Sequence, residues 1–134
     1  MTNPNQDHID EFRANDGQLG GQLTGAPMLL LHHVGVKSGE ERISPLTYQV
    51  VDSGYAVFAS NYGKTTHPAW FHNLQANSST TIEIGADTVS VKARFTDPEE
   101  RDRIFEEQVR AMPPFADYVE SSGRVIPVVV LERI

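Results

Sequence analysis

The sequence predicts an α+β fold, a barrel-like sheet of about six mostly antiparallel strands with short helices inserted. Apolar runs of strand length recur along the chain and are joined mostly by short turns. The regular strand–helix alternation of a doubly wound parallel sheet is absent. With 134 residues, the chain has the usual size of one domain, in which we expect the barrel to span residues 27–134.

Residues 1–26 are expected to form an N-terminal helix and a glycine-rich lead-in. Ile9 and Phe12 lie three positions apart, which predicts a short amphipathic helix over Asp7–Asn15. The segment 16–27 contains four glycines and predicts a loop.

Three strands are expected next, at Met28–Val34, Ile43–Val51 and Tyr55–Ser60. Pro45 favours a sheet edge or a break near the start of the second strand, because proline cannot donate to a ladder. Asp52–Gly54 has the composition of a tight hairpin turn. The three strands are therefore predicted to form an antiparallel meander.

The middle of the chain predicts a short helix over His67–Ala76, with Pro68 in its first turn. Two further strands, Thr80–Ile84 and Thr88–Phe95, follow and are separated by a glycine-containing turn.

The last part of the chain predicts two helices and a closing strand. Asp97 and Pro98 form a good helix start, and this helix is expected to run to about Met112. A second helix is expected over Phe115–Ser122 and a sixth strand over Val125–Leu131.

Composition excludes several classes of protein. The absence of cysteine excludes disulfides, iron–sulfur clusters and thiolate zinc sites. A net charge of −7 argues against nucleic-acid binding, which depends on neutralising phosphates. No apolar run approaches the ~20 residues of a transmembrane helix, and the polar N-terminus has no signal-peptide pattern. We therefore expect a cytoplasmic location.

The histidines do not predict a metal site. His32 and His33 are neighbours on a predicted strand, so their side chains point to opposite faces. His67 and His72 are five positions apart, which is not the spacing of a helical metal-binding pair. Nor does any serine lie in a G-x-S-x-G motif.

Two segments have the composition of a ligand site. In the turn 36–42, Lys37 and Arg42 together with backbone N–H groups can hold an anionic group, although an ordinary solvated turn has the same composition. The small residues from Ala59 onward let backbone approach a flat ligand, and a helix N-terminus follows. Trp70 in that helix is either a packing anchor or part of the ligand site.

Three series of residues carry a resemblance to a known family: GVKSGEERISPL, ASNYGKTTHPAWFHNLQAN and RVIPVVVLE. In order and spacing they resemble the deazaflavin (F420)-dependent nitroreductase family, the split β-barrel F420H2-dependent oxidoreductases of actinobacteria. The resemblance runs from about Pro27 to Glu132. It implies that the chain binds coenzyme F420, an 8-hydroxy-5-deazaflavin.

The resemblance also implies which residues bind the cofactor. The family's basic turn, which holds the phosphate and glutamate tail, falls on Lys37, Ser38, Gly39 and Arg42. The residues that line one side of the ring fall on Ser44, Pro45 and Leu46. Those that bind the deazaflavin through backbone amides fall on Ala59, Ser60, Asn61, Tyr62 and Gly63. The residues that buttress the pocket fall on Pro68 and Trp70.

The implied reaction is hydride transfer from C5 of reduced F420 to an electron-poor acceptor: a quinone, an enone or unsaturated lactone, or a nitro compound. Phe115 and Tyr118 are expected to cover the acceptor, and Tyr118 or water to supply a proton. Of the tyrosines that nitroimidazole-reducing members carry near the late helix, only Tyr118 is present. The small-molecule acceptor is therefore left open.

Two alternatives remain at this stage. One is the same split barrel with FMN in place of F420, and the other is a non-catalytic deazaflavin carrier. The sequence also leaves open the oligomeric state and any peripheral membrane contact through residues 1–26.

Overall fold

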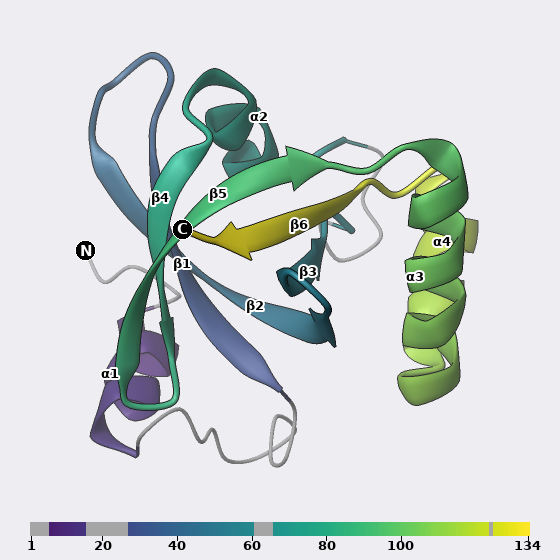
Figure 1. Cartoon of the computed structure of the whole chain (residues 1–134), viewed down its shortest axis with the longest axis horizontal. Coiled ribbons are helices and arrows are strands. Elements are labelled where there is room, and N and C mark those ends of the chain that lie inside the picture. The colour runs from purple at the N-terminus through teal and green to yellow at the C-terminus, as the bar shows by residue number, and fades with distance from the viewer. Residues whose placement is uncertain (1–5, 16–26, 61–65, 124) are drawn as a thin grey trace.

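Six antiparallel strands form a closed barrel in the computed structural model, which describes residues 6–15, 27–60, 66–123 and 125–134 (Figure 1). The strand order around the barrel is β1-β2-β3-β6-β5-β4. The strands are β1 Met28–Val34, β2 Glu41–Val51, β3 Gly54–Phe58, β4 Ser79–Ile84, β5 Asp87–Phe95 and β6 Val128–Arg133. The helices are α1 Gln6–Ala14, α2 Ala69–Ala76, α3 Pro98–Ala111 and α4 Pro114–Ser122. The predicted α+β barrel and the meander β1-β2-β3 are confirmed.

The side chains of β1 alternate between two apolar clusters. Leu29 and Leu31 lie in the barrel interior, where Trp70 and Leu74 of α2 also pack. Leu30 points outward and packs against α1. In Figure 1, α2 and the β1–β2 hairpin turn lie at the same end of the barrel, at the top of the view, so α2 closes this end.

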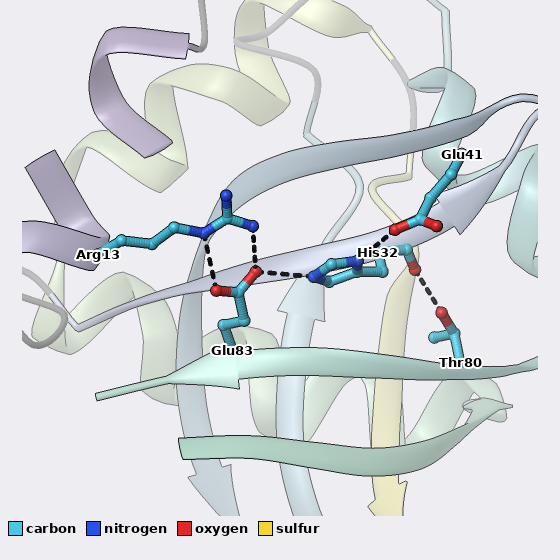
Figure 2. Close-up of polar contacts among 5 residues, drawn as sticks. All are labelled: Arg13, His32, Glu41, Thr80 and Glu83. Carbon is cyan, nitrogen blue, oxygen red and sulfur yellow. Dashed lines mark hydrogen bonds and ion pairs between the residues drawn. The ribbon is translucent and has the colours of Figure 1, made fainter. Parts of the chain in front are cut away.

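The predicted amphipathic stripe of α1 is confirmed, because Ile9 and Phe12 are both buried against the outer side of the barrel. A chain of charged groups supports this contact (Figure 2). Arg13 donates two hydrogen bonds to Glu83, at 2.9 and 2.8 Å. His32 lies between two carboxylates, with its ring nitrogens 2.7 Å from Glu83 and 2.8 Å from Glu41. His32 is thus part of the attachment of α1 to the barrel.

Helices α3 and α4 cover the outer side of β3 and β6. The predicted start of α3 is confirmed: the Asp97 carboxylate accepts the Glu100 N–H at 2.8 Å, and Pro98 occupies the first turn. Ile104 of α3 and Phe115 of α4 are buried against β3 and β6. Among the helices that the structure describes, none combines the length and hydropathy that crossing a bilayer requires.

The predicted start of the last strand is wrong. Expected at Val125, it lies at Val128. The intervening carbonyls have other partners: the Ile126 oxygen accepts from the Arg101 side chain at 2.9 Å, and the Pro127 oxygen accepts the Ala59 N–H at 3.0 Å. Pro127 itself has no N–H for a ladder.

Other predicted boundaries shift by one or two residues, including three close to the candidate site. The third strand ends at Phe58 rather than Ser60. The helix expected from His67 begins at Ala69, because Pro68 is its N-cap and has an extended backbone. The second strand begins at Glu41, two residues earlier than expected. Predicted structure for residues 1–5 and 16–26 lies outside the described residues.

Gly54 of β3 pairs with Glu132 of β6, and a substitution there tests the packing of the barrel wall. A Cβ at Gly54 would overlap the Leu131 carbonyl oxygen, which belongs to the backbone and cannot move aside. We expect Gly54→Ala to lower the free energy of unfolding by about 3 kcal/mol or more. Urea-induced unfolding measures the change.

Gly123→Ala is the matched control for this substitution. Gly123 ends α4 with φ +64°, and open space surrounds its Cα. Only the left-handed backbone penalises alanine there, so the expected loss is about 1 kcal/mol. Equal losses in the two variants would contradict the close approach at Gly54.

Candidate functional site

The β1–β2 turn is held in one shape by hydrogen bonds within it. Gly35 N–H donates to the Glu40 oxygen and Gly39 N–H to the Gly35 oxygen, both at 2.9 Å. The Ser38 hydroxyl accepts the Glu40 N–H at 3.2 Å. Gly39 has φ +70°, a backbone conformation that glycine adopts without strain. The predicted turn is therefore confirmed as a preformed structure.

Two exposed cations flank this turn. Lys37 lies at its tip, whereas Arg42 lies on β2, directly opposite His33 of β1. The sequence predicts that both cations lie in the turn. This is wrong for Arg42, because β2 begins at Glu41 and includes Arg42. Neither cation forms an ion pair with any residue that the structure describes. Both are therefore available to an anion at this end of the barrel.

A buried polar network connects the turn to α2. The Asn73 side-chain oxygen accepts the Val36 N–H at 3.2 Å. The Asn73 amide nitrogen lies 2.9 Å from Nδ1 of His33, and Nε2 of His33 lies 2.9 Å from the Ser44 hydroxyl. His33 and Asn73 are 4% and 6% exposed. Four groups from β1, β2, α2 and the turn are therefore fixed relative to one another.

The sequence interpretation did not assign His33 and Asn73 to the site. A signal was available for His33: it alternates with Leu29 and Leu31, which places a polar side chain on the interior face of β1. Nothing in the sequence indicates that Asn73 would reach it. The prediction that His32 and His33 face opposite sides is confirmed.

His33 is neutral at pH 7. Burial, together with the charges of Arg42 and His32, lowers the pKa of His33 from 6.5 to about 4. The hydrogen bonds also fix which nitrogen carries the proton. A backbone N–H can only donate, so the Asn73 oxygen faces Val36 and its nitrogen faces His33. Nδ1 must then accept, and Nε2–H donates to Ser44.

The segment Ser44–Leu46 lies along an open edge of β2. This part of β2 pairs with β1 on one side, from Met28↔Thr47 to Val34↔Glu41. The pairing of β2 with β3 begins only at Tyr48↔Val57, so within the described residues no strand pairs with the other edge of Ser44–Leu46. Pro45 thus lies at an open edge, as the sequence predicts.

The chain that leaves β3 begins next to this open edge. Ala59 is fully buried and donates its N–H to Pro127, so it turns away from β2 toward the start of β6. Ser60 is half-buried. The other predicted residues of this segment, Asn61, Tyr62 and Gly63, lie outside the described residues.

Pro68 and Trp70 are packing residues of α2. Both are buried, and Trp70, 5% exposed, contacts the apolar interior of the barrel and the edge of Phe71. Trp70 therefore anchors the helix that carries Asn73.

Phe115 and Tyr118 lie on α4, close to the end of β3. The ring of Phe115 makes edge contacts with Phe58 and Tyr118, at centroid distances of 5.4 and 5.3 Å. Phe115 is buried, whereas Tyr118 is half-buried. Tyr118 is therefore the member of this pair whose side chain a bound molecule can reach.

No cluster of three metal-ligating side chains occurs among the residues described. A cavity of about 620 Å³ lies between α3 and the barrel and contains none of the predicted site residues. It is lined by Gln49, Val51, Asp52, Ser53, Arg94, Glu100, Arg103, Ile104, Glu106, Glu107, Arg110 and Glu132.

The fold and the cationic turn define a class of protein: a barrel with a cationic hairpin turn beside an open strand edge. Comparison with known proteins makes this class specific. A family model described as F420H2-dependent quinone reductase matches residues 5–133, and the chain belongs to this family. The cofactor of the family is coenzyme F420, as the sequence resemblance implies.

Individual relatives agree with the family assignment. The chain is 34% identical over 130 residues to an F420H2-dependent quinone reductase of Mycobacterium tuberculosis, covering 94% of this chain and 87% of the relative. The solved structure of an F420H2-dependent reductase, FDR-A, matches with a TM-score of 0.71 at 34% identity, over 79% of this chain and 94% of that one.

A more distant structure shares the fold alone. The heme storage protein HutZ of Vibrio cholerae matches with a TM-score of 0.63 at 17% identity, over 96% of this chain and 89% of that one. The match confirms the split barrel.

The low pKa of His33 predicts a pH dependence of stability. The unfolded chain binds a proton at this histidine as the pH falls below 6.5, but the folded chain does so only near pH 4. Stability is therefore lost as the pH falls through this window, by about 2 kcal/mol between pH 7 and pH 5.

Urea-induced unfolding at the two pH values measures this loss, and His33→Gln provides the comparison. The wild-type protein should lose about 2 kcal/mol more than His33→Gln over the same interval. Equal losses would show that His33 is protonated alike in the folded and unfolded chains.

Proposed function

We propose that this chain is an F420H2-dependent reductase that transfers a hydride from reduced F420 to a quinone or a related electron-poor acceptor. The observation that carries the proposal is that two cations, Lys37 and Arg42, lie at the β1–β2 turn of an otherwise acidic protein and form no ion pair within the described part of the chain. Membership of the F420H2-dependent quinone reductase family supports it.

The residues of the turn fit the anionic part of F420. Lys37 and Arg42 provide two exposed positive charges for the phosphate and glutamate tail. The Ser38 hydroxyl accepts a bond within the turn, so its own hydrogen can still be donated. We assign tail binding to Lys37, Ser38, Gly39 and Arg42.

The open edge of β2 fits the flat ring. Ser44, Pro45 and Leu46 provide a wall with no neighbouring strand in the described part of the chain. Ala59 and Ser60 begin the opposite side, and we extend this assignment to Asn61, Tyr62 and Gly63. We assign Pro68 and Trp70 an indirect role, in which they support the pocket by holding α2 against the barrel.

When bound, reduced F420 supplies the hydride from its C5. The protein fixes the orientation of the ring, excludes water on the side of the barrel and holds the anionic tail. We expect the acceptor over the exposed ring face, next to Tyr118, whose ring packs against Phe115. A proton for the reduced product comes from the Tyr118 hydroxyl or from water.

Turnover with a defined acceptor tests the proposed function. Purified protein is mixed with F420H2 and menadione, and the appearance of oxidised F420 is followed by absorbance. We expect catalytic turnover with F420H2 and none with reduced FMN. Tight binding of F420 without turnover on quinones, enones or nitro compounds would instead support a non-catalytic carrier.

Reversal of the charge at Lys37 is expected to weaken F420 binding. One charge-assisted contact contributes about 1.5–3 kcal/mol, so Lys37→Glu should raise the Kd for F420 tenfold or more. Isothermal titration calorimetry measures the Kd. Lys92→Glu makes the same charge change at an exposed position on β5 and should leave the Kd within about twofold. An unchanged Kd in Lys37→Glu would remove the proposed tail contact.

Removal of the Tyr118 hydroxyl separates the two proton sources. If the hydroxyl donates the proton, Tyr118→Phe should lower kcat for menadione by about a hundredfold or more and leave the Kd for F420 unchanged. Steady-state kinetics with both substrates measures this. A kcat within twofold of wild type would assign the proton to water.

A further inference from the structure

His33 is a buried polar group with no role among the family motifs considered above, yet it lies at the centre of the site. It contacts Ser44 at one ring nitrogen and Asn73 at the other. Through Asn73 it is connected to the Val36 N–H, in the turn that carries Lys37. One neighbour, Ser44, belongs to the ring-lining edge, and the other, Asn73 of α2, connects His33 to the tail-binding turn.

We propose that His33 is a positioning residue for cofactor binding: it orients Asn73, which holds the Val36 N–H in place, and it turns the Ser44 hydroxyl into a donor toward the bound deazaflavin ring. This inference rests on the proposed function, because it assumes that F420 occupies the site. It does not place His33 in contact with the cofactor.

The first half of the proposal follows from the Asn73 amide. Unrestrained, a side-chain amide can rotate by half a turn and exchange its oxygen and nitrogen. Only the orientation with the oxygen toward Val36 accepts the backbone N–H, and only an unprotonated Nδ1 of His33 accepts from the nitrogen. The Nε2–H tautomer of the neutral imidazole therefore selects the orientation of Asn73 that holds the turn.

The second half follows from the other ring nitrogen. Because Nδ1 accepts, Nε2 carries the hydrogen and donates it to the Ser44 oxygen at 2.9 Å. The hydroxyl hydrogen of Ser44 is then not used by His33, and it has no acceptor among the residues described. Ser44 is half-buried at the open edge of β2, where a carbonyl or ring nitrogen of a deazaflavin can accept this hydrogen.

A double-mutant cycle on F420 binding tests the coupling. We expect His33→Phe and Ser44→Ala each to raise the Kd for F420 roughly five- to tenfold. Adding Ser44→Ala to His33→Phe should change the Kd by less than twofold, because the hydroxyl is no longer directed toward the ligand. Independent, multiplying effects of the two substitutions would overturn the proposal.

His32→Phe is the matched control. It is the same substitution one residue away on β1, but His32 faces α1 and the carboxylates Glu41 and Glu83. It should lower the melting temperature and leave the Kd for F420 within twofold. If His33 had only a structural role, His33→Phe would also lower the melting temperature and leave the Kd for F420 unchanged. That result would overturn the proposal.

Nitrogen-15 NMR of the wild-type protein without cofactor provides a second, independent test. At pH 7 the spectrum should show His33 as the neutral Nε2–H tautomer, and the Val36 amide should be protected from hydrogen exchange. An Nδ1–H tautomer would overturn the proposal even if His33→Phe does not fold. If the wild-type protein does not bind F420 at all, the proposed function fails, whatever the NMR result.

Discussion

The buried Asn73 side chain holds the functional end of the barrel together. It joins α2 to β1 through a buried hydrogen bond with His33, and to the β1–β2 turn through a partly buried hydrogen bond with the Val36 N–H. Loss of a partner there would leave a buried polar group unsatisfied, which costs about 1–3 kcal/mol. Hydrogen bonds within the turn fix its shape, and the contact with Asn73 fixes its position relative to α2.

The barrel explains why α2 stays in place. Trp70 and Leu74 of α2 pack in the barrel interior, in the same cluster as Leu29 and Leu31 of β1. The same strand contributes Leu30 to the outer contact with α1. One seven-residue strand thus contributes to the core, anchors the N-terminal helix and, through His33, supports the site.

The fold was predictable where local patterns decide it. The alternation and length of Met28–Val34, the capping of α3 by Asp97 and the turn glycine Gly39 each depend on neighbours in the sequence. The start of β6 has one local and one distant cause. Pro127 is visible in the sequence and indicates a break in the ladder. The contact of the Ile126 carbonyl with Arg101, 25 positions away in the sequence, could not be predicted.

The candidate site divides in the same way. Lys37 and the turn around it were recognisable from the motif, whereas the role of His33 requires knowing that Asn73, 40 positions along the chain, lies beside it. Trp70 had two interpretations from sequence; the structure shows that it is buried in the barrel, and its part in the cofactor pocket stays a prediction. Membership of the family indicates that the cofactor is F420. The contacts that orient the turn are known only from the structure of this chain.

The central claim is that the cationic turn recognises the anionic tail of F420. Calorimetric titration of the wild-type protein with F420 and, separately, with the deazaflavin that lacks the phosphate and glutamate tail tests it most directly. The two ligands share the ring, so the tail alone accounts for any difference. The account predicts that the tail-less compound binds at least tenfold more weakly. Equal affinities would contradict it and assign binding to the ring alone.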